Sequence, residues 1–302
     1  MTLSIVVITM NRADQLRSAL LSCVYSKLPV DTEFVIVDNA STDNTELVVK
    51  EFFSEQPYSY NYEKEEVNKG VGGGRNRGFE MAHGDFLYFL DDDAVISSDS
   101  YDTFFELPIK LFRKDDSIAS ITTRIYDEML KCDRDVRYSK HSVDSSVPDI
   151  FMYLGGSHFL RKACYCSPLY LDFKYGMEEL LPCLYVLDRG FRNCYLHQIK
   201  ILHQPKYNKW ESGDDKMSHI NVLYNVNCYV SKKLIYPMIY RPVLFSAFIC
   251  RTLSRFGLNK KMWDDTINTL KQIKMQLPTH ARKIKNKTIF TIINDYSFGA
   301  AF

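Results

Sequence analysis

Three consecutive carboxylates, Asp91, Asp92 and Asp93, end an unbroken apolar run at residues 86–90. An aromatic run of this length is typical of a strand that is buried on both faces of a sheet. Open α/β sheets bind their ligands at the carboxyl ends of the strands. Three adjacent acids repel one another, so a cation that neutralises them would stabilise the site. The triplet therefore indicates a divalent-metal site that also holds a nucleotide diphosphate, with a solvated acidic turn as the alternative.

Two further groups with possible chemistry stand later in the chain. Glu178 and Glu179 head a stretch that we expect to be helical to about residue 188. Acids favour a helix N-terminus for dipole reasons alone, so capping is the alternative to a catalytic role. His203 follows an expected strand at 191–201. A lone histidine is usually structural, but its place after an apolar strand and an acidic motif favours a functional role.

A glycine-rich segment occupies residues 68–78. A run of glycines lets the backbone approach a ligand closely and offers it amide donors. We expect a helix from about residue 75 to 83, with Arg75 near the turn, where it either meets anionic oxygen or stays solvated. A dinucleotide fingerprint is absent because Arg75 stands where the last glycine belongs. No Gly-Lys-Ser/Thr follows, which excludes a P-loop.

Alternating strands and helices must position these residues. Apolar runs and helical spacing predict strands at 3–9, 33–37, 58–62 and 86–90, and helices at 13–26 and about 43–53. This β-α-β-α-β order implies a parallel sheet with right-handed crossovers. A helix at 101–112 and a strand at 117–123 follow, before a polar excursion at 124–148 that we expect to be a loop. The fold class is α/β, with a mostly parallel, doubly wound (Rossmann-like) sheet.

Composition narrows the class of protein. The 302 residues, of which 46% are hydrophobic, suffice for one large α/β domain with an appendage. A net charge of +1 gives no reason to expect nucleic acid as a partner. The eight cysteines form no CxxC pair, so zinc spacing is absent and reduced thiols are the simplest interpretation. With no N-terminal signal pattern, we expect a cytoplasmic protein.

The C-terminal region, residues 211–302, has a different character from residues 1–210 and is expected to be helical from about residue 214. Its segment 234–250 is apolar, but two prolines and Arg241 interrupt it, so it is a poor transmembrane span. Lysines and arginines flank the segment and suit an anionic surface, although a solvated basic face is the default. The region would contact an acceptor, a second subunit or the inner face of a membrane.

Motifs at the ends of the strands resemble the family 2 glycosyltransferases of GT-A fold. The motifs are Ser-Ile-Val-Val-Ile-Thr-Met-Asn-Arg at 4–12, Val-Ile-Val-Asp-Asn-Ala-Ser-Thr-Asp at 35–43, the glycine-arginine segment at 68–78, and Phe-Leu-Asp-Asp-Asp at 89–93. The resemblance is firm to about residue 95 and looser to about 205. It implies a nucleoside-diphosphate sugar donor, a divalent cation (Mn²⁺ or Mg²⁺) and inversion at the anomeric carbon.

The resemblance also implies roles for individual residues. On the donor side, Thr9, Asn11 and Arg12 would surround the base and ribose, Asp38 would recognise the base, Asn68, Gly70 and Arg75 would flank the nucleotide and diphosphate, and Asp91 and Asp92 would complete the nucleotide-sugar site. Asp93, Asp91 and His203 would bind the metal, with Asp93 the best ligand. Gly155 and Gly156 resemble the acceptor-side glycine segment. Glu178 and Glu179 match the acidic pair that supplies the catalytic base, and either of them could act.

The chemistry agrees with these roles. A departing nucleoside diphosphate develops charge that a carboxylate-bound Mg²⁺ or Mn²⁺ stabilises, and an attacking acceptor hydroxyl needs a carboxylate base. The Gln-x-x-Arg-Trp motif of processive polymerases is absent, which argues for addition of a single hexosyl or deoxyhexosyl unit. By family habit, the acceptor is a surface glycan, a lipid-linked sugar or a glycoprotein.

Two other classes of protein stay open at this point. A nucleotidyltransferase would usually carry its glycine-rich loop just after the first strand, where this chain has Asn11 and Arg12 instead. An inactive sugar-nucleotide-binding protein or scaffold is disfavoured by the intact acidic triplet and the glutamate pair.

Overall fold

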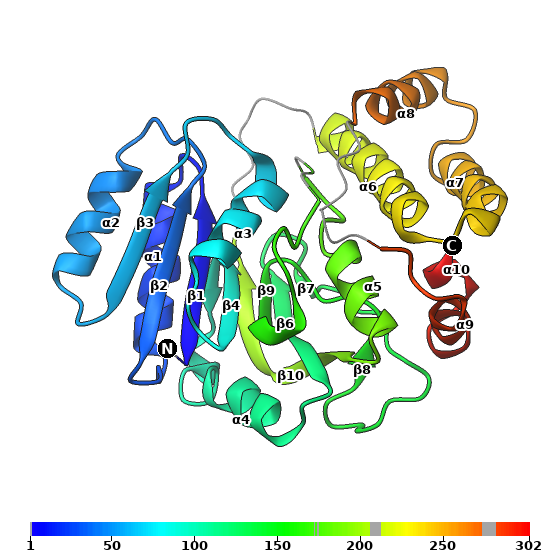
Figure 1. Ribbon diagram of the computed structural model, residues 1–302. Coiled ribbons are helices and arrows are strands. Elements are labelled where there is room, and N and C mark those ends of the chain that lie inside the picture. Colours follow the sequence, from blue (N-terminus) through cyan, green and yellow to red (C-terminus); the bar gives the residue numbers. More distant parts are fainter. Residues whose placement is uncertain (1, 172, 174, 206–212, 274–281) are drawn as a thin grey trace.

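The computed structural model describes residues 2–171, 173, 175–205, 213–273 and 282–302 of the chain. Its strands form one mixed sheet of order β3-β2-β1-β4-β9-β6-β10-β5 (Figure 1). The strands are β1 (Leu3–Thr9), β2 (Thr32–Asp38), β3 (Ser59–Lys64), β4 (Phe86–Asp91), β5 (Ala94–Ile96), β6 (Ile118–Asp127), β7 (Cys132–Asp133), β8 (Asp149–Ile150), β9 (Ser157–Arg161) and β10 (Arg192–His203). The helices are α1 (Ala13–Tyr25), α2 (Thr45–Ser54), α3 (Gly70–Met81), α4 (Glu106–Lys114), α5 (Leu180–Asp188), α6 (Gly213–Ile235), α7 (Arg241–Phe256), α8 (Lys260–Gln272), α9 (Asn286–Asp295) and α10 (Phe298–Ala301), with 3-10 turns η1 (Ser98–Ser100), η2 (Lys162–Cys164) and η3 (Met238–Tyr240).

The first four strands in the sheet order are parallel, as the alternation of elements predicts. β1 pairs with β2 on one side, where Thr9 stands opposite Asp38, and with β4 on the other, where Ile8 stands opposite Asp91. The carboxyl ends of these strands therefore meet at one edge of the sheet. This register brings the first motif, the second motif and the acidic triplet together.

Beyond β4 the strand directions are mixed, so the parallel arrangement holds for part of the sheet. β9 is antiparallel to both β4 and β6, whereas β10 is parallel to β6 and antiparallel to β5. The expected loop at 124–148 is wrong at its start, because β6 continues to Asp127. Ile125 is buried opposite Ile201, and Asp127 stands opposite His203. Residues 124–127 thus extend a central strand to the edge that carries the acidic triplet.

Both faces of the sheet are buried. Leu3, Ile5 and Val7 of β1 pack with α1, α2 and α4, while Val6 packs on the other face with α3 and α5. This period of two follows from the pleat of the strand. Helix α4 begins at Glu106 rather than near residue 101, which places Pro108 in the first helical turn, where a missing N–H costs nothing.

The helix expected from about residue 75 begins earlier and takes in the glycine-rich segment. Helix α3 begins at Gly70, so the glycines that follow lie within its first turns. A Cβ atom on Gly72 would lie 2.1 Å from the carbonyl oxygen of Leu171, and one on Gly78 would lie 2.4 Å from a Val6 methyl. The glycines therefore let α3 pack directly on the chain and the sheet. The backbone of this segment thus closely approaches other parts of the protein.

The helices after residue 213 gather on the far side of α5 from β3 (Figure 1). They share a hydrophobic core with α5, in which Leu180 and Leu184 pack among residues such as Val226 and Ile289. Asp188 at the end of α5 also accepts hydrogen bonds from the Thr288 hydroxyl at 2.7 Å and from a backbone N–H of the α9 region. Among the described residues, the structure contains no helix with the length and hydropathy needed to cross a bilayer.

Candidate functional site

The three residues expected to bind metal lie together at the carboxyl edge of the sheet. One possible ligand atom from each of Asp91, Asp93 and His203 lies within 4.8 Å of the other two. Asp91 ends β4 and Asp93 follows it, while β10 delivers His203 opposite Ala94 of β5. Two carboxylates and an imidazole suit Mn²⁺, and the carboxylates also suit Mg²⁺. The residues present therefore fit a divalent cation.

Asp127 fixes the orientation of His203, a contact that the sequence analysis misses. His203 Nδ1 lies 3.1 Å from Asp127 Oδ2, and His203 Nε2 lies 3.4 Å from Asp93 Oδ1. Burial would raise the pKa of Asp127, but hydrogen bonds from the Leu130 N–H, Arg134 and His203 lower it to about 2. A permanently ionised Asp127 selects the tautomer that carries a proton on Nδ1 and leaves Nε2 free as a ligand. Asp127 lies beyond the expected strand at 117–123, among charged and polar residues, so no local signal in the sequence marks it.

Arg12 and Thr9 hold the middle and last members of the triplet. The Thr9 hydroxyl donates to Asp92 at 2.8 Å, and one Arg12 nitrogen donates to both Asp92 and Asp93 at 2.9 Å. Burial raises the pKa of Asp92 to about 6 although Arg12 opposes this shift. The Arg12 side chain is 39% exposed, so part of the guanidinium remains open to a ligand.

The first and second motifs meet at the loop that follows β2. Asp38 is fully buried and accepts hydrogen bonds from the Ser41 N–H at 2.7 Å and the Tyr62 hydroxyl at 2.6 Å. Asn11, with a φ of +54°, accepts the Thr42 N–H at 2.7 Å. These contacts fix the shape of the loop, and they occupy part of the hydrogen-bonding capacity of Asp38 and Asn11.

Asn68 and Asn39 secure the start of α3. The Asn68 side-chain oxygen accepts the N–H of Gly70 at 2.7 Å, and Gly70 has a φ of +75° that suits a residue without a side chain. The buried Asn39 accepts the Lys69 N–H and donates to the carbonyl of Gly70. Asn68 and Gly70 therefore stand at the helix start, next to the loop after β2.

Arg75 lies at the centre of the site and is surrounded by protein oxygens. Its side chain is only 3% exposed. One nitrogen donates to Glu178 at 2.9 Å and Glu179 at 3.1 Å, and the other donates to Asp91 and the Gly155 carbonyl, both at 2.9 Å. Burial would lower the pKa of Arg75, but the surrounding carboxylates raise it. The guanidinium thus joins the acidic triplet to the glutamate pair.

Glu179 and the glycines at 155–156 are in close contact. A Cβ atom on Gly155 would lie 1.9 Å from Glu179 Oε1, and one on Gly156 would lie 3.2 Å from Asp91 Oδ2. Burial, and then the negative charge of Glu178, raise the pKa of Glu179 to about 8 against the opposing effect of Arg75. Only glycine leaves room for this carboxylate.

The turn before the glutamate pair is anchored by α6. The Asn227 amide donates to the carbonyls of Tyr175 and Gly176 at 3.0 and 2.8 Å. The rings of Tyr175 and Tyr224 are stacked with centroids 6.0 Å apart. Gly176 and Met177 both have positive φ, at +84° and +66°. Helix α6, to which the sequence analysis assigns no site residue, therefore fixes the approach to Glu178 and Glu179.

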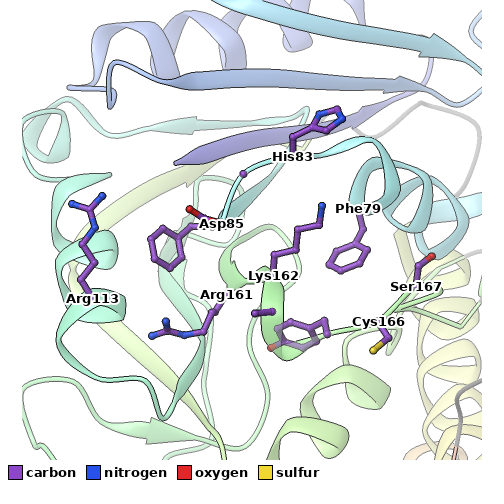
Figure 2. Close-up of a pocket in the computed structure, with 12 residues that line it drawn as sticks. Phe79, His83, Asp85, Arg113, Arg161, Lys162, Cys166 and Ser167 are labelled. Atoms are coloured by element: carbon purple, nitrogen blue, oxygen red, sulfur yellow. The ribbon is translucent and has the colours of Figure 1, made fainter. Parts of the chain in front are cut away.

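Among the cavities bordered by described residues, two lie at opposite ends of the strands. A cavity of about 120 Å³ borders the triplet and is lined by Asp14, Gln15, Ser18, Asp92, Asp93, Val95 and Gln204. A larger cavity of about 690 Å³ lies where β4 begins, with Phe79, Arg161 and Lys162 around it (Figure 2). The length of β4, about 17 Å at 3.3 Å per residue, separates the larger cavity from Asp91. It belongs to a different part of the molecule from the acidic edge.

Solved structures with the same arrangement define the fold as GT-A. S. aureus TarS in complex with UDP-GlcNAc is similar with a TM-score of 0.63 and 16% identity, covering 89% of this chain and 80% of that chain. The mannosyltransferase PcManGT from Pyrobaculum calidifontis, in complex with GDP-Man and Mn²⁺, gives a TM-score of 0.61 and 14% identity over 90% of this chain and 76% of that chain. The expected GT-A fold is confirmed.

The sequence comparison finds a family model that matches part of the chain. Residues 4–135 match the model described as Glycosyl transferase family 2. A β-1,3-glucosyltransferase of Campylobacter jejuni, named as acting on GalNAc(5)-diNAcBac-PP-undecaprenol, is 30% identical over 104 residues, which are 34% of this chain and 33% of the relative. The match thus spans about a third of that relative's length. The resemblance stated from the motifs is confirmed.

Proposed function

We propose that this protein is an inverting, metal-dependent glycosyltransferase that moves one sugar from a nucleoside-diphosphate sugar to an acceptor hydroxyl. The observation that carries the proposal is the contact network of Arg75. Its guanidinium binds Asp91 of the candidate metal site and, on the other side, Glu178 and Glu179. Asp91 of the candidate metal site and the candidate bases thus lie on either side of one buried guanidinium. A displacement reaction requires that the leaving group and the base be held in such a fixed arrangement.

The donor would bind at the edge formed by the ends of β1, β2 and β4. Asp93, Asp91 and His203 would hold Mn²⁺ or Mg²⁺, which would neutralise the charge that develops on the leaving diphosphate. The half-open guanidinium of Arg12 is well placed to reach the nucleotide, with Asp92 facing the ribose and Thr9 fixing Asp92. Asp38 and Asn11 would shape the base-binding loop.

Arg75 is assigned a positioning role in place of diphosphate binding. All of its observed partners are protein oxygens, and 97% of its side chain is covered, since only 3% is exposed. A buried guanidinium that holds two glutamates and Asp91 orients both ends of the site. Asn68 and Gly70 remain candidates for the nucleotide side because they lie at the start of α3 beside the loop after β2.

Glu179 is the better candidate for the general base. Its pKa of about 8 is matched to proton abstraction near neutral pH, whereas Glu178 makes the shorter ion pair with Arg75, at 2.9 Å. Glu179 also borders Gly155, on the side that we assign to the acceptor. Deprotonated Glu179 would take the proton of the acceptor hydroxyl as that oxygen attacks the anomeric carbon.

The acceptor is proposed to be a surface glycan, a lipid-linked sugar or a glycoprotein. The Campylobacter relative is named for a glycan on undecaprenyl diphosphate, which favours a lipid-linked or growing glycan for this chain as well. The stacked pair of Tyr175 and Tyr224 stands at the approach to the glutamates and offers a ring for a sugar to lie against.

A panel of UDP- and GDP-sugars tests the proposed function. Donor hydrolysis or transfer is measured with Mn²⁺, with Mg²⁺ and with chelator. We expect release of nucleoside diphosphate from one donor class, and loss of release with chelator. Release of pyrophosphate from a nucleoside triphosphate would instead indicate a nucleotidyltransferase. Metal-dependent binding of a donor without turnover, with every acceptor class tested, would indicate a sugar-nucleotide-binding protein.

A further inference from the structure

Helix α7 has an outward face that is uncharged. It packs inward through Leu244, Phe248 and Thr252, which are four residues apart and buried. The residues on the opposite side are exposed and carry no charge, namely Pro242, Val243, Ser246, Cys250, Leu253 and Ser254. A solvated surface helix normally presents charged and polar residues on that side, whereas this face combines two serines with uncharged, mostly apolar side chains. The lack of charge leaves the face suited to contact with an apolar surface.

Large apolar side chains extend this face at the start of the helix. Met238 and Ile239 in η3 are 65% and 77% exposed, and Phe245 and Leu253 of α7 are 52% and 41% exposed. Together with Val243 these residues form what we call the α7 patch. The helix lies at the outer margin of the molecule, beside α8 and above α9 and α10 (Figure 1).

Cations flank the patch without carboxylate partners. Lys233 lies 5.6 Å from the centre of the Tyr229 ring, whose other neighbours include Phe245, and Lys283 donates to the carbonyl of Leu234 just before η3. Within the described residues, no carboxylate forms an ion pair with Lys233, Arg241 or Lys283. Burial, and then the positive charge of Arg241, lower the pKa of Lys283, so these two cations lie close enough to repel each other. An external anion would relieve this repulsion.

The segment of sequence that contains the patch is basic. Residues 216–263 contain eight lysines and arginines and no aspartate or glutamate. A second copy of the chain would bring the same cations against this surface, so self-association through the patch is opposed by charge repulsion. An apolar stripe bordered by lysine and arginine is complementary to the surface of a bilayer with anionic headgroups, into which such side chains insert while their charges stay at the headgroups.

We propose that the α7 patch docks the protein on the surface of a membrane that contains anionic lipid. Met238, Ile239 and Phe245 enter the boundary between headgroups and acyl chains. Lys233, Arg241 and Lys283 contact lipid phosphates. This contact lies along the surface of the bilayer and rests on the patch alone, so it holds or fails independently of the proposed reaction.

Co-sedimentation of the full chain with vesicles tests the proposal. The vesicles are phosphatidylcholine alone and phosphatidylcholine mixed with phosphatidylglycerol. We expect binding to the mixed vesicles that weakens as salt is added, and little binding to phosphatidylcholine alone. The double variant Ile239→Ser with Phe245→Ser should weaken binding about tenfold or more. Arg241→Gln should weaken binding to anionic vesicles about fivefold.

Matched variants on the other half of the molecule control for general loss of apolar or basic surface. Leu47→Ser removes a side chain of α2 that is 54% exposed, and Lys110→Gln removes an exposed cation of α4; both should bind vesicles like the unchanged protein. Circular dichroism verifies that each variant is folded. Equal vesicle binding by the patch variants and the controls would overturn the proposal, as would failure of the unchanged protein to bind anionic vesicles. A concentration-dependent dimer that the double variant abolishes would identify a second copy as the occupant and would also overturn it.

Discussion

Arg75 Nη1 lies 3.1 Å from Glu179 Oε1, while the second terminal nitrogen of the same guanidinium lies 2.9 Å from Asp91. The candidate base and the candidate metal ligand are thus tied to one buried cation. Since Arg75 has no open face toward solvent, its charge serves to hold these carboxylates at fixed positions.

Removal of this cation should damage both stability and activity. Arg75→Ala leaves the buried carboxylates of Glu178 and Glu179 and the partly exposed one of Asp91 without their partner, which should cost about 3–5 kcal/mol of unfolding free energy. Arg75→Lys keeps the charge but loses the forked geometry, so the fold should survive with strongly reduced kcat. Arg77, two residues along α3, is the matched control because it pairs with Glu63 on the surface. Arg77→Ala should change stability by about 0–1 kcal/mol. Equal denaturant midpoints for Arg75→Ala and Arg77→Ala would contradict the central role of Arg75.

Glu179→Gln should abolish transfer while donor binding persists. Loss of a general base lowers kcat by about 10²–10⁴-fold. The amide is nearly isosteric, so calorimetric titration with the donor should give an affinity close to that of the unchanged protein. Full turnover by Glu179→Gln, together with an inactive Glu178→Gln, would move the base to Glu178.

The pH dependence of the reaction should report the raised pKa of Glu179. The base acts in its deprotonated form, so kcat/KM should rise with pH through about 8, the pKa given by burial and the charge of Glu178. Glu178→Gln removes the neighbouring negative charge, so the ascending limb should move to lower pH. A limb that stays in place in that variant would exclude coupling between the two glutamates.

Gly155→Ala should reduce activity through a steric conflict. The added methyl would lie 1.9 Å from Glu179 Oε1 and 2.9 Å from Arg75, so one of these groups must shift. The overpacking should cost about 1–3 kcal/mol of stability. Gly299→Ala is the control, because its Cβ would meet no atom closer than 3.9 Å. Thermal unfolding and donor turnover of the two variants check the prediction, which an active and fully stable Gly155→Ala protein would contradict.

The sequence predicts well that the first motifs meet at one edge of the sheet, because each of them follows a strand in the same part of the chain. Apolar runs locate β1, β2 and β4, and the parallel register then brings Thr9, Asp38 and Asp91 to one edge. The partners of Arg75 cannot be predicted in this way. Glu178 lies 103 residues away in sequence, and its approach depends on α6 and on the turn at 175–177. No local pattern encodes such a contact.

The glycine-rich segment shows a second limit of prediction from the sequence. Glycines lower helix propensity, so the segment resembles a loop, yet close packing against Leu171 and Val6 requires both the helix and the missing side chains. Tertiary contact overrides propensity there. The same holds for Asp127, whose polar surroundings resemble a loop although pairing with β10 extends the strand.

Mn²⁺ binding in the presence of a nucleoside diphosphate, followed by electron paramagnetic resonance, tests the central claim most directly. UDP and GDP are titrated with the unchanged protein, with Asp93→Ala and with Asp99→Ala. The last variant is the control, because Asp99 is an exposed acid near Asp93 in sequence that pairs with Lys200. We predict that the protein-bound Mn²⁺ signal appears with one of the two nucleotides, persists in Asp99→Ala and is lost in Asp93→Ala. A signal of equal strength in Asp93→Ala would contradict the assignment of the metal and donor site to the end of β4.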